Sequence, residues 1–236
     1  RELYALVMQR GYSSWREAVH AYRLLYMRTA DLTARARIRD AAIDCFAEQG
    51  FDASVRDIAL RADVSPGLIT HHFGTKTALR GECDAEVLRR YHEVKEKGVA
   101  VPNQQLIGVL SDPGVSATLL VYILRAVLAG GDPARDFLSR LIDDLRPVMA
   151  HAVETGLARP SRDEEARLRA LTHLSLGGML VRFLLDPMSS PESFVASLQD
   201  PARDDILPLL EIFTEGVLGT ADLLEEYLTY REGSLT

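Results

Sequence analysis

The stretch ASVRDIALRADVSPGLITHHF, residues 53–73, constrains the fold of this chain more than any other feature. Ser54 and Ser65 each suit the position just before a helix, and Pro66 follows at a first helical position, where a missing N–H is harmless. Asp63 lies between the two segments, and Asp tolerates the left-handed backbone of a tight turn. The stretch therefore predicts two short helices joined by a short turn, which is a helix-turn-helix unit.

The segments on either side of this unit also have helical periodicity. Residues 33–50 repeat apolar side chains at helical spacing and end in Gly50, which predicts a supporting helix. A longer helix is predicted from Thr75 or Lys76 to about Lys97. Because neither short helix would be stable alone in water, we expect both to pack on the supporting helix.

The remainder of the chain is predicted to be helical as well. The run VSATLLVYILRAVLAG at 115–130 is apolar on nearly all sides, which predicts a buried helix. Further helices are predicted over 133–155, 163–185 and 204–230, with a loop over 186–200. Period-two alternation is missing from the sequence, so strands are not expected. The expected fold is all-α, with an N-terminal helix-turn-helix head and a C-terminal helical bundle.

Charge is divided unevenly between the two ends of the chain. Residues 1–80 hold 12 Lys and Arg against 9 Asp and Glu, a balance of +3, whereas residues 81–236 hold 15 against 25, a balance of −10. An acidic body with a slightly basic head fits a protein whose N-terminal part alone meets a polyanion.

Several classes of protein are disfavoured by the sequence. The two cysteines, Cys45 and Cys83, form no CxxC pair, which excludes a disulfide framework and favours a cytoplasmic protein. The longest apolar runs are too short and too interrupted to cross a bilayer, so no membrane association is expected. No phosphate loop, dinucleotide fingerprint, GxSxG or HExxH motif occurs, so we assign no catalytic residue, no cofactor and no enzymatic activity.

The adjacent pair His71 and His72 raises the question of a metal site. Neighbouring residues on a helix point about 100° apart, and a shared metal would need His at i and i+4 or a Cys/His set. Neither pattern occurs here, so no metal is assigned. The remaining alternatives are two ordinary exposed side chains or two side chains on a surface that meets a negatively charged partner.

Three segments in order resemble the TetR family of transcriptional regulators: RIRDAAIDCFAEQGF, then SVRDIALRADVSP, then HHFGTKTAL. The resemblance implies a DNA-binding domain at 33–80 and an effector-binding and dimerisation domain at 81–236, after an extension at 1–32. Two positions depart from the family pattern. Asp63 stands where the family usually has Gly, and Thr70 stands where it often has Tyr.

In the family, the third helix enters the major groove, and the starts of the second and fourth helices grip the DNA backbone. The resemblance implies a DNA-binding set made of Ser54, Arg56, Ser65, Gly67, Leu68, Thr70, His71, His72 and Lys76. Within this set, Arg56 occupies a position that can contact a base, and Arg pairs best with guanine. His72 and Lys76 match positions that contact phosphates.

The resemblance also implies a homodimer that binds a pseudo-palindromic operator in double-stranded DNA and is released by a small-molecule effector. Candidate effector contacts are polar or aromatic residues within apolar helical stretches: Tyr122, Arg125, Phe137, Arg140, His173 and Arg182. Arg125 is favoured because it is the only charge in the run 115–130, and a buried Arg needs a partner. The alternative for each residue is an ordinary paired position in the core.

Other functions stay open at this point. The chain could be an activator or a ligand-independent regulator, a metabolite-binding protein or enzyme with a vestigial head, or a dimerisation scaffold. The extension at 1–32 has helical periodicity from Trp15 onward. It is either an arm that packs on the body or contacts DNA, or sequence upstream of a natural start at Met27.

Overall fold

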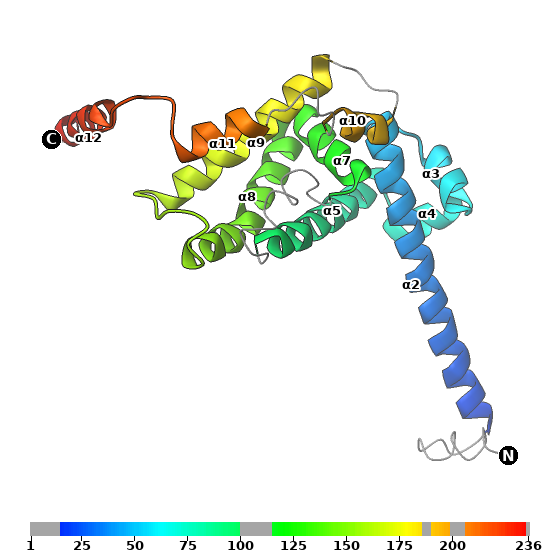
Figure 1. Ribbon diagram of the computed structural model, residues 1–236. Helices are drawn as coiled ribbons and strands as arrows, with labels where there is room; N and C mark the ends of the chain where they lie inside the picture. Colours follow the sequence, from blue (N-terminus) through cyan, green and yellow to red (C-terminus); the bar gives the residue numbers. More distant parts are fainter. Residues whose placement is uncertain (1–14, 100–114, 186–189, 199–205, 235–236) are drawn as a thin grey trace.

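The computed structural model describes residues 15–99, 115–185, 190–198 and 206–234. Within these residues the chain forms ten helices and no strand, which confirms the all-α prediction (Figure 1). The first 14 residues of the predicted extension lie outside the described part.

The helix-turn-helix head consists of α2 (Trp15–Gln49), α3 (Val55–Ala62) and α4 (Pro66–Phe73). The sequence predicts that the supporting helix starts at residue 33, and this start is wrong. Instead α2 is one helix of 35 residues, whose N-terminal half projects away from the rest of the molecule (Figure 1). The physical reason is that neither Gly nor Pro interrupts the sequence anywhere between its ends.

The body is built on four longer helices whose predicted positions are confirmed to within a few residues. They are α5 (Lys76–Val99), α7 (Ala117–Leu128), α8 (Gly131–Glu154) and α9 (Glu164–Leu185). Helix α7 lies at the centre, because seven of its residues are buried, including Leu119 to Leu124. It packs against α2, α5, α8, α9 and α10, so the head and the body share one hydrophobic core.

The predicted loop over 186–200 contains a helix instead, α10 (Pro191–Leu198). Its short length hides the helical pattern in the sequence, but Phe194 is only 1% exposed. The Phe194 ring meets the Phe183 ring of α9 edge-on, with 5.2 Å between centroids. Tertiary packing of this kind stabilises a helix that would not form alone.

The single helix predicted over 204–230 is also wrong, because two helices occupy this region. They are α11 (Ile206–Thr214) and α12 (Asp222–Ser234), and α12 stands away from the body (Figure 1). The break contains Gly216, which has a φ of +82° that only glycine adopts readily, and a second glycine, Gly219.

Large apolar side chains remain exposed on the C-terminal helices. Those at least half exposed on α9, α11 and α12 are Leu174, Val181, Leu184, Leu185, Leu207, Leu209, Phe213, Leu223, Tyr227 and Tyr230. Contrary to the expectation from the sequence, α9 is long and apolar enough by length and composition to cross a membrane, with 17% of its most apolar window buried. Core helices of soluble proteins pass the same test, so this finding assigns no membrane location.

Candidate DNA interface and the cavities behind it

The two short helices of the head start at well-formed caps. The Ser54 hydroxyl accepts a hydrogen bond from the Asp57 backbone N–H at 3.1 Å, and the Asp57 carboxylate accepts one from the Ser54 N–H at 3.1 Å. The hydrogen bond from the Ser54 hydroxyl lowers the pKa of Asp57. Ser65 caps α4 in the same way by accepting from the Leu68 N–H at 3.3 Å. Both predicted caps are therefore confirmed.

The turn between these helices has the predicted backbone. Asp63 lies in the left-handed region with φ 53° and ψ 54°, and it is the one non-glycine residue with positive φ in the described part of the chain. The Asp63 N–H is bonded to the Leu60 carbonyl, and the next N–H, of Val64, donates to the Ala59 carbonyl at 3.0 Å. The turn closes α3 and fixes the angle at which α4 leaves it.

Helix α4 is held on the head by its inner face. Ile69 and Phe73 are 3% and 7% exposed. The guanidinium of Arg35 lies 4.6 Å from the centroid of the Phe73 ring and donates a hydrogen bond to the His72 carbonyl. Because α4 is anchored on this side, its other face is left exposed.

The residues predicted to bind DNA divide by exposure. Ser54, Arg56, Ser65, Gly67, Thr70 and His71 are exposed, whereas Leu68, His72 and Lys76 are half-buried. Arg56 forms no hydrogen bond or ion pair within the described residues, so its guanidinium is available. The Thr70 hydroxyl donates back to the Pro66 carbonyl at 3.3 Å, and the His72 ring packs edge-on to Phe73. Lys76 begins α5, beside Thr75, whose hydroxyl accepts from the Ala78 N–H at 3.1 Å.

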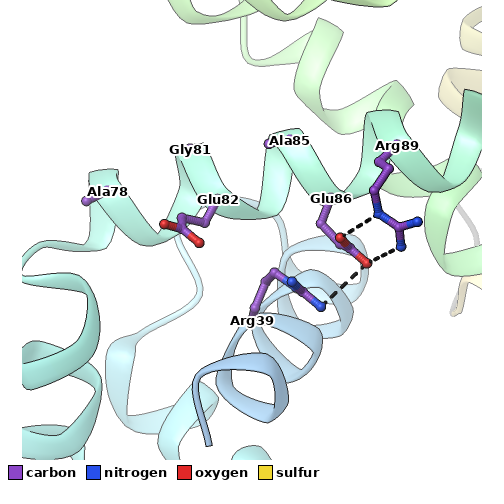
Figure 2. A pocket seen from close by; sticks show the side chains of 7 residues that line it. All are labelled: Arg39, Ala78, Gly81, Glu82, Ala85, Glu86 and Arg89. Atoms are coloured by element: carbon purple, nitrogen blue, oxygen red, sulfur yellow. Dashed lines mark hydrogen bonds and ion pairs between the residues drawn. The ribbon is translucent and has the colours of Figure 1, made fainter. Parts of the chain in front are cut away.

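Ion pairs join the supporting helix α2 to α5, which runs from the head into the body. Figure 2 shows Glu86 of α5 between Arg39 of α2 and Arg89, at 3.5 Å and 2.8 Å. The Arg90 Nε lies 2.6 Å from the same carboxylate. Hydrogen bonds from Arg89 and Arg90 lower the pKa of Glu86 to about 2, against the opposing effect of burial. The open hollow beside this cluster is lined on α5 by Ala78, Gly81, Glu82, Ala85, Glu86 and Arg89.

Arg125, the favoured effector contact, is bound to the head. Its Nε donates to the Ala47 carbonyl at 2.6 Å and its Nη2 to the Glu48 carbonyl at 2.9 Å. Both carbonyls belong to the last turn of α2, where they have no partner within the helix. The guanidinium also lies 5.6 Å from the centroid of the Phe183 ring. Arg125 thus connects α2, α7 and α9.

Tyr122 and Phe137 lie in the shared core, and both are 0% exposed. The Tyr122 hydroxyl donates to the carboxylate of Asp84 at 2.6 Å. Burial raises the pKa of Asp84, and the hydrogen bond from Tyr122 works against this rise. Asp84 is 7% exposed, and its role cannot be predicted from the sequence, since a lone Asp on an amphipathic helix carries no pattern.

Behind the head, an apolar cavity of about 210 Å³ lies among α5, α8 and α9. Its lining is mostly Leu, Val, Ala and Met, with four polar residues: Tyr91, Lys95, Thr172 and Ser175. None of the six candidate effector residues lines this cavity. His173 is exposed on α9, and Arg182 donates to the Ser197 carbonyl of α10 at 3.0 Å.

Comparison with known proteins agrees with this architecture. Residues 38–83 match the family model for bacterial regulatory proteins of the tetR family, and residues 116–219 match that for the tetracyclin repressor-like C-terminal domain. The HTH-type transcriptional regulatory protein RaaS of Mycobacterium tuberculosis is 36% identical over 203 residues, which cover 86% of this chain and 95% of RaaS. The chain belongs to the TetR family. It is a DNA-binding transcriptional regulator.

Other relatives of this TetR-family chain are more distant. The HTH-type transcriptional repressor AcnR of Corynebacterium efficiens is 28% identical over 182 residues, covering 76% of this chain and 92% of AcnR. A TetR-family structure from Rhodococcus superposes with a TM-score of 0.51 at 23% identity, over 70% of this chain and 94% of that one. At this identity, the superposition supports the fold and nothing finer.

Proposed function

We propose that this TetR-family regulator is a homodimeric repressor that binds a pseudo-palindromic operator through its helix-turn-helix head. The observation that carries the proposal is the exposed outer face of α4 and of the start of α3. There Arg56, Gly67, Thr70 and His71 are free of the core while Ile69 and Phe73 anchor the unit. A helix of this width fits the major groove of B-DNA, and Lys76 at the start of α5 suits a phosphate.

We propose that the two functions belong to two successive parts of the chain. Residues 33–80 form the DNA-binding domain and residues 81–236 form the effector-binding and dimerisation domain. The family-model matches to 38–83 and 116–219 support this division. We also propose a cytoplasmic location, where the DNA of a bacterium is, and no catalytic activity, cofactor or membrane contact.

A second copy of the chain is the proposed partner of the exposed apolar residues on α9, α11 and α12. A solvent-exposed set of this size is unusual for a monomer. Pairing two copies through one shared surface gives two-fold symmetry, which matches the symmetry of a palindromic operator.

The proposed effector site is the apolar cavity among α5, α8 and α9, where Tyr91, Lys95, Thr172 and Ser175 would orient an otherwise apolar small molecule. Helix α5 links this cavity to the operator, because Lys76 begins it and Tyr91 and Lys95 lie on its second half. A ligand that binds more tightly to one position of α5 would shift the population of dimers away from the conformation in which the two heads have the spacing that the operator requires. DNA affinity that stays constant with every ligand bound in the body would contradict this switch.

Selection of bound sites from random duplex DNA, at a stated near-physiological salt concentration, tests the DNA-binding proposal. We expect a palindrome whose half-sites are about one helical turn apart, or a multiple of it. Binding without sequence preference, lost as salt rises, would contradict a specific operator. Whether transcription falls or rises when the protein is supplied then separates a repressor from an activator.

Changing Arg56 and Lys76 to Ala distinguishes the regulator from a metabolite-binding protein with a vestigial head. Loss of DNA binding with an unchanged melting temperature supports the regulator. A parent protein that does not bind DNA, whether or not a ligand is present, would favour the vestigial head. The AcnR relative is named as a repressor, which supports the proposed sign of control.

A further inference from the structure

A second cavity lies at the junction of the head and the body and has a different character from the apolar cavity. This junction cavity, of about 450 Å³, is bounded by the end of α2, the start of α5 and the start of α8. Its charged lining consists of Lys76, Arg80, Asp84, Asp136 and Arg140, and Phe51 covers one side. The cavity therefore gathers three cationic side chains from two helices in one place.

Arg80 is the central cation of the junction cavity. Its guanidinium carbon lies 3.6 Å from the centroid of the Phe51 ring, which fixes the plane of the group. The Nε and Nη2 atoms are buried and have no hydrogen-bonding partner within the described part of the chain. The nearest carboxylate, on Asp84, is 3.9 Å from Nε, too far for a hydrogen bond. Buried guanidinium N–H groups without acceptors are costly, so an acceptor from outside the chain would stabilise this arrangement.

The surrounding charges favour an acceptor that is an anion. Lys76 and Arg140 form no ion pair within the described residues, so both are available to a ligand. Of the two acids, Asp84 is already occupied by the Tyr122 hydroxyl at 2.6 Å, and Asp136 is exposed on α8. Burial raises the pKa of Asp84, whereas the hydrogen bond from Tyr122 and the charges of Arg80 and Arg140 act against this rise.

We propose that the junction cavity is a binding site for a compact oxyanion, a phosphate or a carboxylate group, held by Arg80 and Arg140. Guanidinium groups bind both kinds of oxyanion through paired N–H donors, so the geometry points to this shared chemistry. The site is separate from the apolar cavity, which lies farther along α5 and has a mostly apolar lining.

Lys76 makes the junction cavity relevant to DNA. The same residue lines the cavity and is proposed to contact an operator phosphate. An anion bound in the cavity would neutralise Lys76 and weaken its attraction to DNA. This consequence rests on the proposed function, whereas the existence of the anion site does not.

Isothermal titration calorimetry on the full chain, without DNA, tests the site. Inorganic phosphate and succinate are the two probes, each at constant ionic strength set with potassium chloride. We expect saturable binding of at least one probe, weakened at least tenfold by Arg80→Gln and by Arg140→Gln. Arg135→Gln is the matched control, because Arg135 is exposed on the same helix and paired with Asp132 outside the cavity. The probe that binds more tightly identifies the phosphate or the carboxylate as the natural group.

Two outcomes would overturn the proposal. One is that neither probe binds saturably to the parent protein, and the other is that Arg135→Gln weakens binding as much as Arg140→Gln. Arg140 is exposed, so its variant keeps the test valid even where Arg80→Gln lowers the melting temperature. Adding the tighter probe to a DNA-binding assay with the selected operator is a separate measurement. Unchanged DNA affinity there would overturn the link through Lys76 and leave both the anion site and the regulator intact.

Discussion

The Nε of Arg125 donates a hydrogen bond to the carbonyl oxygen of Ala47 at 2.6 Å, across 78 positions of sequence. Ala47 lies in the last turn of α2, and Arg125 lies in α7, so a residue of the body caps the supporting helix of the head. A cation at a helix C-terminus also interacts favourably with the helix dipole. The contact places Arg125 where it couples the position of the head to that of the body.

Replacing Arg125 with Met keeps the apolar stem and removes both hydrogen bonds. We expect the free energy of unfolding to fall by about 2 kcal/mol, because two carbonyls at the end of α2 lose charged donors. Urea denaturation measures the change, and Arg135→Met, at an exposed position on α8, is the control. Unchanged stability together with lost effector binding would instead favour Arg125 as an effector contact.

Gly50 lies beside the same guanidinium and has a φ of +83°. A Cβ at this position would lie 3.3 Å from the Arg125 Nη1. We expect Gly50→Ala to lower the free energy of unfolding by about 1–2 kcal/mol, because of backbone strain and displacement of the Arg125 side chain. Gly156→Ala is the matched control, because Gly156 has a φ of +78° and open space around its Cβ position. Equal melting temperatures for the two variants would show that only the backbone matters.

Asp63 occupies a left-handed position that glycine would adopt without strain. We expect Asp63→Gly to be neutral or to stabilise the protein by up to about 1 kcal/mol, and Asp63→Ala to destabilise it by a similar amount. Thermal unfolding of both variants checks the sign. A stabilising effect of Ala would contradict the assigned backbone conformation.

Replacing Arg56 with Ala and replacing Lys76 with Ala should weaken DNA binding in two different ways. Loss of a base contact at Arg56 should cost about 1–3 kcal/mol of binding and relax the sequence preference at one base pair. Loss of a phosphate contact at Lys76 should weaken binding to all sequences. It should also reduce, by about 1, the magnitude of the slope of the logarithm of the binding constant against the logarithm of the salt concentration. Fluorescence anisotropy over a series of salt concentrations separates the two patterns, with Arg135→Ala, at an exposed cation on α8 outside the proposed sites, as the control. Identical patterns for both variants would argue against these roles.

Glu86 should make stability depend on pH. Its pKa falls from the ordinary 4.5 to about 2 in the folded protein, so its contribution is complete above pH 4.5 and is lost as pH falls toward 2. After allowance for solvent screening around the exposed Arg89, the free energy of unfolding of Glu86→Gln should be about 2 kcal/mol lower at pH 7 than that of the parent protein. The difference should shrink as the pH of the denaturation experiment is lowered. Glu93→Gln, which removes a more exposed partner of Arg89, should change stability by less than about 0.5 kcal/mol. A difference that grows toward low pH would contradict the assignment.

The sequence determined those features that depend on neighbouring residues. Ser54, Ser65, Pro66 and Asp63 fix caps and a turn through their own side chains and backbone preferences, and the structure confirms the caps and the turn. The positions of the longer helices of the body follow in the same way from their apolar spacing. Periodicity alone could not find the true start of α2 or the break at Gly216. The spacing of apolar residues indicates which side of a helix is buried, but it does not fix the residues at which the helix begins and ends.

Only the tertiary structure decided what the isolated polar residues of the body contact. The partner of Arg125 is a pair of backbone carbonyls, which no side-chain pattern can reveal, and Tyr122 is bound to Asp84 from a different helix. The junction cavity likewise combines Arg80 of α5, Phe51 after α2 and Arg140 of α8, three segments that are separate in sequence. Local chemistry specifies the helices and the turn, whereas the sites between helices exist only once packing has brought distant residues together.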